Sequence, residues 1–143
     1  MNKKLKIAVL GDGGWGTVLA ILLCEKGYEV FLWSAFRDNA KSLVRHGENR
    51  KFLPGFRIPG GVNVTSDMRI ACKDADLIIL AIPSRFLRDV LAKNKAALKG
   101  SGAGFVSVVK GVEQGTLLRM SEVAIDVLGR VKIAVLSGPS IAP

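Results

Sequence analysis

Five short apolar runs recur along the chain, and segments of helical length separate them. The runs are nearly continuous rather than alternating with polar residues, which is typical of parallel strands that are buried on both faces. They are rich in β-branched residues, which strands favour. We predict strands at the five runs, with 62–64 as a weaker sixth candidate: 7–10, 30–33, 77–82, 105–109 and 133–136.

The segments between the runs carry apolar residues at helical spacing. In the first of them, Val18, Leu19, Leu22 and Leu23 share a face, and Gly27 follows as a stop signal. Helices are predicted over 15–26, 38–46, 86–98 and 117–128. Strands that alternate with helices form right-handed βαβ units, so we predict an α/β fold with a doubly wound parallel sheet, as a single domain over 1–143.

The stretch 47–61 is the one long segment without such a pattern. It contains Pro54, Pro59 and several glycines. Loops of this length in a compact domain are functional or mobile. Because the turn signal at Pro54 follows the apolar residues Phe52 and Leu53, we predict a loop that packs on the domain.

Composition narrows the range of partners. The chain has 143 residues and a net charge of +9, but its lysines and arginines are scattered from Lys3 to Lys132 and no aromatic stripe interleaves with them. An anionic small molecule explains this charge as well as a nucleic acid does, and no nucleic-acid motif is present. No apolar run approaches the roughly 18 residues of a membrane span. We therefore predict neither a nucleic-acid nor a membrane partner.

The cysteines and the histidine offer no metal chemistry. Cys24 and Cys72 lie in helix-like segments without metal-ligand spacing, which indicates buried thiols of a reducing, cytoplasmic protein. The only histidine, His46, ends a polar helical segment, where it would serve as a charge partner of the helix C-terminus. We predict no metal site.

A glycine-rich turn follows the first apolar run and opens the first predicted helix. Its spacing, G-x-G-x-x-G, is that of a dinucleotide site in a Rossmann fold. The first glycine allows the tight turn, the second lets backbone approach a pyrophosphate, and the third lets helix and strand pack closely. Trp15 could cap the pyrophosphate or pack in the core. The predicted cofactor-binding residues here are Gly11, Gly13, Gly14, Trp15 and Gly16.

The second run ends where an NAD site has an acidic residue for the ribose 2′-hydroxyl. This chain has Ser34 there, and Arg37 follows closely. An arginine can pair with a 2′-phosphate, which a carboxylate would repel. The sequence therefore favours NADP over NAD, with Ser34 and Arg37 as cofactor-binding residues. Asp38 is the opposing signal, unless it caps the next helix.

Residues after the later runs reach the same edge of the sheet. Ser84 is the expected N-cap of the third predicted helix, and Phe86 could lie beside the nicotinamide ribose or in the core. Lys110 follows the fourth run, where burial of an unpaired ammonium would be costly, so we expect it to reach the cleft and hold an anionic or carbonyl substrate. The alternative is a surface lysine. The turn 137–140 adds hydroxyls and N–H groups.

Together these residues resemble the N-terminal domain of the bacterial NAD(P)-dependent glycerol-3-phosphate dehydrogenases. The matching strings occur in the family's order and span nearly the whole chain. They are 11–17, 32–33, Asn49 with 52–55, 82–84, 110–113, 120–121 and 136–142.

The resemblance implies reversible hydride transfer between NAD(P)H and dihydroxyacetone phosphate, which gives sn-glycerol 3-phosphate for phospholipid synthesis. Lys110 would be the catalytic cation that holds a developing alkoxide or a phosphate. The implied contacts are Gly14, Trp15, Lys110 and Ala142 with the dinucleotide, and Lys110, Gly138 and Ser140 with the triose phosphate.

The chain departs from the family pattern in three places. Asp12 stands where the family has a small neutral residue, and the basic residue after Trp33 comes later than usual. The family's helical C-terminal domain, with its proton-transferring lysine, is missing. We therefore expect this chain to bind a dinucleotide but to turn over slowly or not at all. An under-covered last strand would favour self-association, which is consistent with a homo-oligomer.

Two other functions fit a dinucleotide-binding domain. One is a non-catalytic module whose partner chain uses the exposed sheet edge. The other is a different β-hydroxyacid-type dehydrogenase, such as a ketopantoate reductase. The combination of 110–113 with 137–140 argues against the second alternative.

Overall fold

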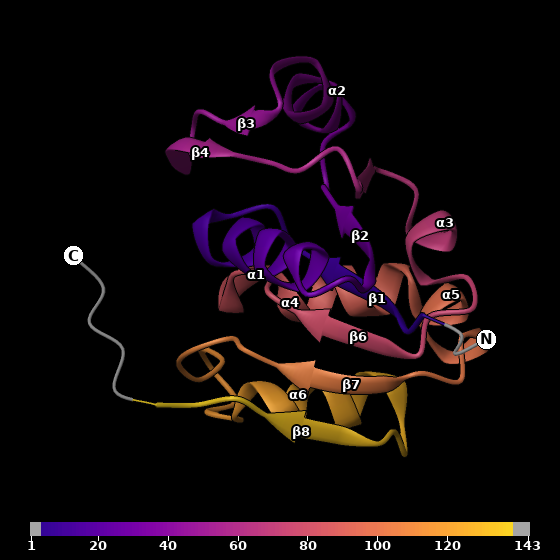
Figure 1. Ribbon diagram of the computed structural model, residues 1–143. Coiled ribbons are helices and arrows are strands. Elements are labelled where there is room, and N and C mark those ends of the chain that lie inside the picture. The colour runs from indigo at the N-terminus through magenta and orange to yellow at the C-terminus, as the bar shows by residue number, and fades with distance from the viewer. Residues whose placement is uncertain (1–3, 139–143) are drawn as a thin grey trace.

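The computed structural model describes residues 4–138, which form a six-stranded parallel sheet flanked by helices (Figure 1). The strands of this sheet are β1 (Lys6–Leu10), β2 (Glu29–Trp33), β5 (Val62–Thr65), β6 (Leu77–Leu80), β7 (Gly104–Ser107) and β8 (Ile133–Val135). The helices are α1 (Gly14–Glu25), α2 (Arg37–His46), α3 (Met68–Cys72), α4 (Ser84–Lys93), α5 (Lys95–Gly100) and α6 (Met120–Leu128). The predicted α/β class is confirmed, and so is the weak candidate strand, which is β5.

The sheet has the strand order β5-β2-β1-β6-β7-β8, and every pairing in it is parallel. The chain starts at the centre with β1, moves outward through β2 to β5, and then returns to β6 on the other side of β1. Leu10 at the end of β1 lies beside Trp33 of β2 and Leu80 of β6. The sheet is therefore doubly wound, and its six carboxyl ends share one edge.

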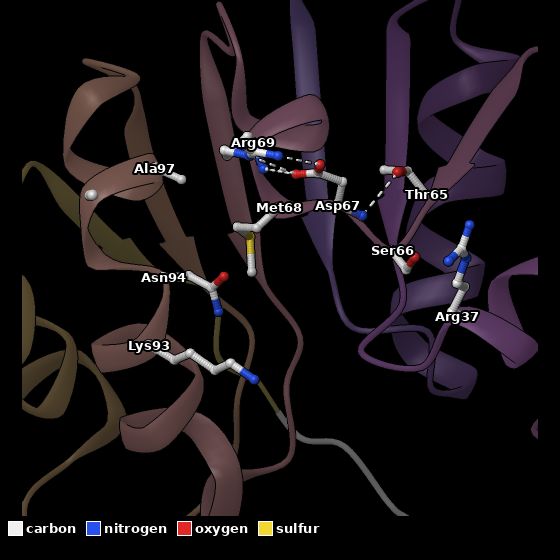
Figure 2. Close-up of a pocket in the computed structure, with 10 residues that line it drawn as sticks. Arg37, Thr65, Ser66, Asp67, Met68, Arg69, Lys93, Asn94 and Ala97 are labelled. Carbon is white, nitrogen blue, oxygen red and sulfur yellow. Dashed lines mark hydrogen bonds and ion pairs between the residues drawn. The ribbon is translucent and has the colours of Figure 1, made fainter.

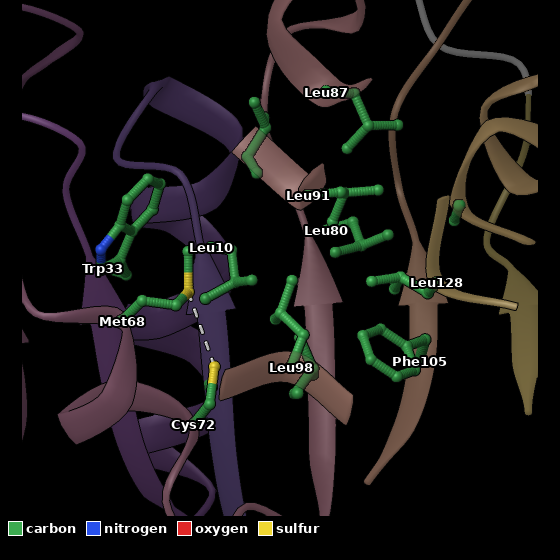
Figure 3. Close-up of a cluster of buried hydrophobic side chains, with 14 of the residues drawn as sticks. Leu10, Trp33, Met68, Cys72, Leu80, Leu87, Leu91, Leu98, Phe105 and Leu128 are labelled. Carbon is green, nitrogen blue, oxygen red and sulfur yellow. Dashed lines mark hydrogen bonds between the residues drawn. The ribbon is translucent and has the colours of Figure 1, made fainter. Parts of the chain in front are cut away.

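Alternate residues of the central strands enter two separate cores. Ala8 and Leu10 join the core formed with α3, α4, α5 and α6, whereas Ile7 and Val9 join the core that contains Ala20 of α1. Figure 3 shows the first core, with Leu10 near its centre. Both faces of the central strands are thus covered, as continuous apolar runs predict.

The third predicted helix, 86–98, is divided. The structure has α4 and α5 in its place, because the backbone leaves helical geometry at Asn94. The Asn94 side-chain amide donates to the Val90 carbonyl at 2.8 Å, which satisfies an acceptor at the end of α4. Such a local side-chain bond competes with helix continuation. The apolar spacing carries across the break, since Leu91 and Leu98 both enter the first core.

Three predicted helix starts are wrong. The last helix begins at Met120 rather than at 117, because Leu117 has a φ of 59°, in the left-handed region. Ser84 is the first residue of α4 and Pro83 takes the cap position, without a side-chain cap. Asp38 lies in the first turn of α2, and the cap position there belongs to another residue. A carboxylate in the first turn still favours the helix through the helix dipole.

The stretch 47–61 packs on the domain, but not through the residues that we expected, because Phe52 is 47% exposed and Leu53 is only partly buried. It is also not irregular. It contains the antiparallel ribbon of β3 (Glu48–Asn49) and β4 (Leu53–Arg57). Asn49 and Ile58 of this stretch are buried. The short helix α3 was also not predicted from the sequence pattern.

The last strand is less covered than a continuous apolar run predicts. Ala134 and Val135 of β8 are exposed, because β8 is an edge strand that pairs only with β7. Cys72 is buried as expected, whereas Cys24 is only partly buried, and both thiols are free. Between residues 4 and 138, no helix has the length and apolar character needed to cross a membrane.

Replacement of Leu80 by alanine tests the central position of β6. Leu80 is fully buried, and its truncation leaves a cavity between the central strands and the helices above them. We expect Leu80→Ala to lower the free energy of unfolding by about 2–5 kcal/mol. Urea unfolding followed by circular dichroism measures this loss.

The matched control is Val44→Ala on the exposed face of α2, where the side chain is 64% exposed. Its unfolding free energy should stay within about 0.5 kcal/mol of the unmodified chain. Equal losses for Leu80→Ala and Val44→Ala would contradict the assignment of the first core.

Candidate functional site

The carboxyl edge of the sheet has one place where neighbouring strands send their connections in opposite directions. β1 continues towards β2, and β6 continues towards β7 on the other side of the sheet. In open α/β sheets, ligands bind in the crevice at such a switch point. The glycine-rich turn follows β1 at this place.

Two glycines of this turn are required by close packing. Gly11 has a φ of 119°, and a Cβ placed on it would lie 2.4 Å from the Ala81 carbonyl oxygen after β6. A Cβ on Gly16 would lie 1.9 Å from the Gly11 carbonyl oxygen and 3.3 Å from the Ala81 Cβ. No side chain fits at either position. These glycines hold the start of α1 against the ends of β1 and β6.

Gly13 is different, because nothing in the fold requires a glycine there. Its φ of −67° suits any residue, and a Cβ on it would meet no atom within 4 Å. Gly13 takes the N-cap position of α1 without a side-chain cap, and the first turn of the helix contains no acidic residue. The helix N-terminus therefore presents backbone N–H groups and partial positive charge to an open space.

Asn49 joins the β3–β4 ribbon to the glycine turn through hydrogen bonds. Its buried side-chain amide donates to the Asp12 carbonyl and to the Thr17 hydroxyl, both at 2.8 Å. Its side-chain oxygen accepts from the Phe52 N–H at 3.1 Å. A Cβ on Gly14 would lie 2.9 Å from the Phe52 carbonyl oxygen, so this glycine is needed where the ribbon crosses. Sequence reasoning did not assign Asn49 this role, although it belongs to the matching strings.

The Asp12 carboxylate lies towards α2. It accepts a hydrogen bond from the side-chain amide of Asn39. The carboxylate is thereby engaged within the protein. The amide of Asn39 is neutral, so this contact sets the direction of the carboxylate and leaves its negative charge in place.

Two aromatic side chains at this edge are half exposed. Trp15, at the start of α1, is 51% exposed, and Phe86, in the first turn of α4, is 46% exposed. The alternative in which either ring packs in the core is therefore wrong. The guanidinium of Arg85 lies 4.6 Å from the centroid of the Phe86 ring.

Ser34 and Arg37 follow β2 but face different surroundings. Ser34 is fully buried, and its hydroxyl donates to the Phe36 carbonyl at 3.2 Å, so the observed function of this hydroxyl is to order the turn. Arg37 is exposed at the start of α2 and lines a cavity of about 600 Å³. Figure 2 shows Arg37 on one side of this cavity and Lys93 with Asn94 on the other. The cofactor contact of each residue stays a prediction.

Lys110 does not end a strand. β7 stops at Ser107, and Lys110 lies three residues further, exposed in the loop before α6. The argument from a buried ammonium is therefore wrong, since the side chain is already in solvent. The position at the carboxyl edge of β7 agrees with the prediction, and the catalytic role remains untested.

A salt bridge that sequence reasoning missed involves Glu113, which follows Lys110 by three positions in the chain. The Arg88 guanidinium, on α4, donates from Nε and Nη2 to the two carboxylate oxygens of Glu113, at 2.7 and 2.9 Å. These bonds and one from the Thr116 hydroxyl lower the pKa of Glu113 to about 2. The carboxylate in turn raises the pKa of Arg88. No local pattern signals this pair, because 25 positions separate its members.

The remaining predicted site residues lie at or beyond residue 138, where the described part of the chain ends. Gly138 is exposed and follows β8, near the hydrogen bond from the Leu136 N–H to the Ser107 carbonyl at 2.9 Å. Ser140 and Ala142 lie outside the described residues.

Comparison with known proteins gives one consistent result. Residues 6–143 match the family described as NAD-dependent glycerol-3-phosphate dehydrogenase N-terminus. The chain is 46% identical over 138 residues to the glycerol-3-phosphate dehydrogenase [NAD(P)+] of Syntrophomonas wolfei, which covers 94% of this chain and 40% of that protein. It is 42% identical over 140 residues to the same enzyme of Carboxydothermus hydrogenoformans, with 95% and 41% covered. The chain thus spans about 40% of the length of these relatives.

Solved structures agree with the sequence match. The glycerol-3-phosphate dehydrogenase of Coxiella burnetii superposes with a TM-score of 0.87 at 32% identity, over 96% of this chain and 42% of that one. The enzyme of Saccharomyces cerevisiae gives a TM-score of 0.82 at 28% identity, over 97% and 43%. The fold, the glycine turn and these matches agree: the chain belongs to the family of the N-terminal domain of NAD-dependent glycerol-3-phosphate dehydrogenase.

Proposed function

We propose that this chain is the dinucleotide-binding part of a glycerol-3-phosphate dehydrogenase. The enzyme would transfer a hydride between NAD(P)H and dihydroxyacetone phosphate and give sn-glycerol 3-phosphate for glycerophospholipid synthesis. One observation carries the proposal: the space beside Gly13 is open, at the N-terminus of α1 and at the switch point of the sheet. The fold itself does not need a glycine at this position, whereas a bound pyrophosphate would. Membership of the family supports the same conclusion.

The residues around this opening fit a dinucleotide. The N–H groups of the first turn of α1 would hold the pyrophosphate, because they combine donors with partial positive charge. Trp15 and Phe86 expose aromatic rings at the same edge, and these would border the cofactor. Arg37 would bind the adenosine 2′-phosphate, which favours NADP. The bound cofactor supplies the hydride.

The residues of this chain would polarise the substrate carbonyl, and the cofactor would reduce it. The Lys110 ammonium, at the carboxyl edge of β7, would stabilise negative charge on the carbonyl oxygen as the hydride arrives, or hold the phosphate of the triose. Gly138 and Ser140 would complete the triose phosphate site, and Ala142 the cofactor site. A lysine of the family's C-terminal domain would deliver the proton to the same oxygen.

A cytoplasmic location and assembly into a homo-oligomer belong to the proposal. Burial raises the pKa of the Cys72 thiol to about 12, so this group is protonated and unreactive at neutral pH. The exposed side chains of Val135 and Leu136 at the edge strand β8 would suit contact with further protein.

Calorimetric titration with NADPH tests the role of Gly13. In Gly13→Ala, the added methyl group has room in the fold but occupies the space of the pyrophosphate, so we expect the dissociation constant of NADPH to rise about tenfold or more. The melting temperature should fall by only a few degrees, because alanine is a poorer N-cap residue than glycine. Gly100→Ala is the control, because a Cβ there also meets no atom within 4 Å.

Three outcomes separate the alternatives. Weakened NADPH binding in Gly13→Ala alone supports the proposed site. Binding of NADPH without oxidation when dihydroxyacetone phosphate is added points to a binding function of this chain by itself. If neither NADPH nor NADH binds the unmodified chain, the proposal fails for this chain.

Replacement of Arg37 by glutamine tests cofactor preference. Loss of the guanidinium should weaken NADPH binding about tenfold and leave NADH binding within about twofold, because only NADPH carries the 2′-phosphate. Arg45→Gln, on the exposed side of α2, is the matched control for loss of one positive charge. Equal effects of Arg37→Gln on the two cofactors would show that the residue acts only through long-range charge.

A further inference from the structure

The loop that carries Lys110 is a small closed unit. Its backbone bonds are largely internal: the Glu113 N–H donates to the Leu118 carbonyl and the Leu117 N–H donates to the Glu113 carbonyl, both at 2.9 Å. Val112 also forms an isolated antiparallel bridge with Arg119. These bonds set the shape of the loop, and Val109 and Leu118 at its two ends pack against the first core. The residues between them need a further attachment to hold their place relative to the helices.

Arg88 attaches this unit to the rest of the domain. Its guanidinium makes the two bonds to Glu113 and a third, from Nη1, to the Asp126 carboxylate of α6 at 2.6 Å. The Thr116 hydroxyl donates to the same Glu113 carboxylate at 2.6 Å. The Glu113 side chain is 16% exposed, so water competes weakly for it. Bidentate arginine–carboxylate pairs fix orientation as well as distance.

The position of this pair distinguishes it from ordinary surface ion pairs. Arg69–Asp67 and Arg119–Glu122 join side chains two and three positions apart, which adds little to what the local backbone already sets. Arg88 instead joins α4 to a loop 25 positions away and to α6, 38 positions away.

Arg88 and its partner Glu113 are each close in the sequence to a residue of the proposed site. Arg88 comes two positions after Phe86 on the same helix, and Glu113 comes three positions after Lys110. The loop and the first turn of α4 both lie at the carboxyl edge of the sheet, after β7 and β6. A displacement of the loop would therefore move the Lys110 ammonium relative to Phe86 and to the glycine turn.

We propose that Arg88 is a positioning residue, which sets the place of Lys110 through its bidentate bond to Glu113. Arg88 does not touch the cofactor in this scheme. It reduces the freedom of the loop before a ligand binds, so that less of the binding free energy is spent on ordering the lysine. The inference rests on the proposed function, and in particular on the implied contact of Lys110 with the dinucleotide, which makes NADPH affinity a readout of where the lysine lies.

A double-mutant cycle with NADPH tests this coupling. Introduced alone, Arg88→Gln should raise the dissociation constant of NADPH about threefold to tenfold. Introduced into Lys110→Ala, the same substitution should change this constant less than about 1.5-fold. Glu113→Gln should reproduce both results. Asp126→Asn, which leaves the bidentate pair in place, should have a smaller effect. Arg88→Lys should be intermediate, because an ammonium cannot form the fork of two bonds.

Hydrogen exchange of the loop amides gives a readout that needs no ligand. In Arg88→Gln, the hydrogen-bonded amides within 111–118, which are those of Glu113, Leu117 and Leu118, should exchange about tenfold faster, because the loop opens more often without its attachment. Arg45→Gln, on α2, is the control and should leave these rates unchanged.

The outcomes are distinct from one another. An equal loss of NADPH affinity with and without Lys110 would overturn the proposal, since Arg88 would then act only on the fold. Unchanged exchange of 111–118 would overturn the attachment itself. If the unmodified chain binds no NADPH, the proposed function fails and the role of Lys110 fails with it, while exchange still decides whether Arg88 holds the loop.

Discussion

The arrangement of the whole edge depends on one close contact, between the start of α1 and the turn that follows β1. Gly16 lies so near the Gly11 carbonyl that a methyl group would overlap it at 1.9 Å, and Gly11 itself is pressed against the residue after β6. This contact brings the N-terminus of a helix to the point between β1 and β6. Every other part of the candidate site is placed relative to that helix end.

The β3–β4 ribbon shows how polar groups extend this contact. A buried amide is costly unless its donors and acceptor are satisfied, and Asn49 satisfies them with the turn residues Asp12 and Thr17 and with Phe52 of the ribbon. The ribbon is therefore held by the backbone of the glycine turn. A stretch of sequence with prolines and glycines becomes an ordered border of the site because one side chain joins it to the turn.

The sequence predicted those features of the fold that depend on the local pattern of apolar residues. Apolar runs located the six strands of the parallel sheet but not the β3–β4 ribbon. The ends of β6 and β7 were overestimated, because Ile82 and Val108 are buried beyond the last strand pairing. Burial and strand pairing are separate properties, and hydrophobicity reports only the first. For β8 the error is of the opposite kind, since an apolar run does not reveal whether an edge strand is covered on both faces.

Contacts between distant positions explain the rest of what was missed. In the sequence, Arg88 does not differ from other arginines that are expected on the surface, and Glu113 is one acidic residue in a polar loop. Only the fold brings the two side chains together. The same limit applies to Ser34, because its place after β2 gave no sign that its hydroxyl would donate to the Phe36 carbonyl. Position along a strand identifies which residues reach the edge, whereas the direction of each side chain depends on bonds made by its neighbours. For a site built from several strand ends, the residue types at the edge therefore indicate the ligand class, and residues outside the motif, such as Asn49 and Arg88, set the geometry.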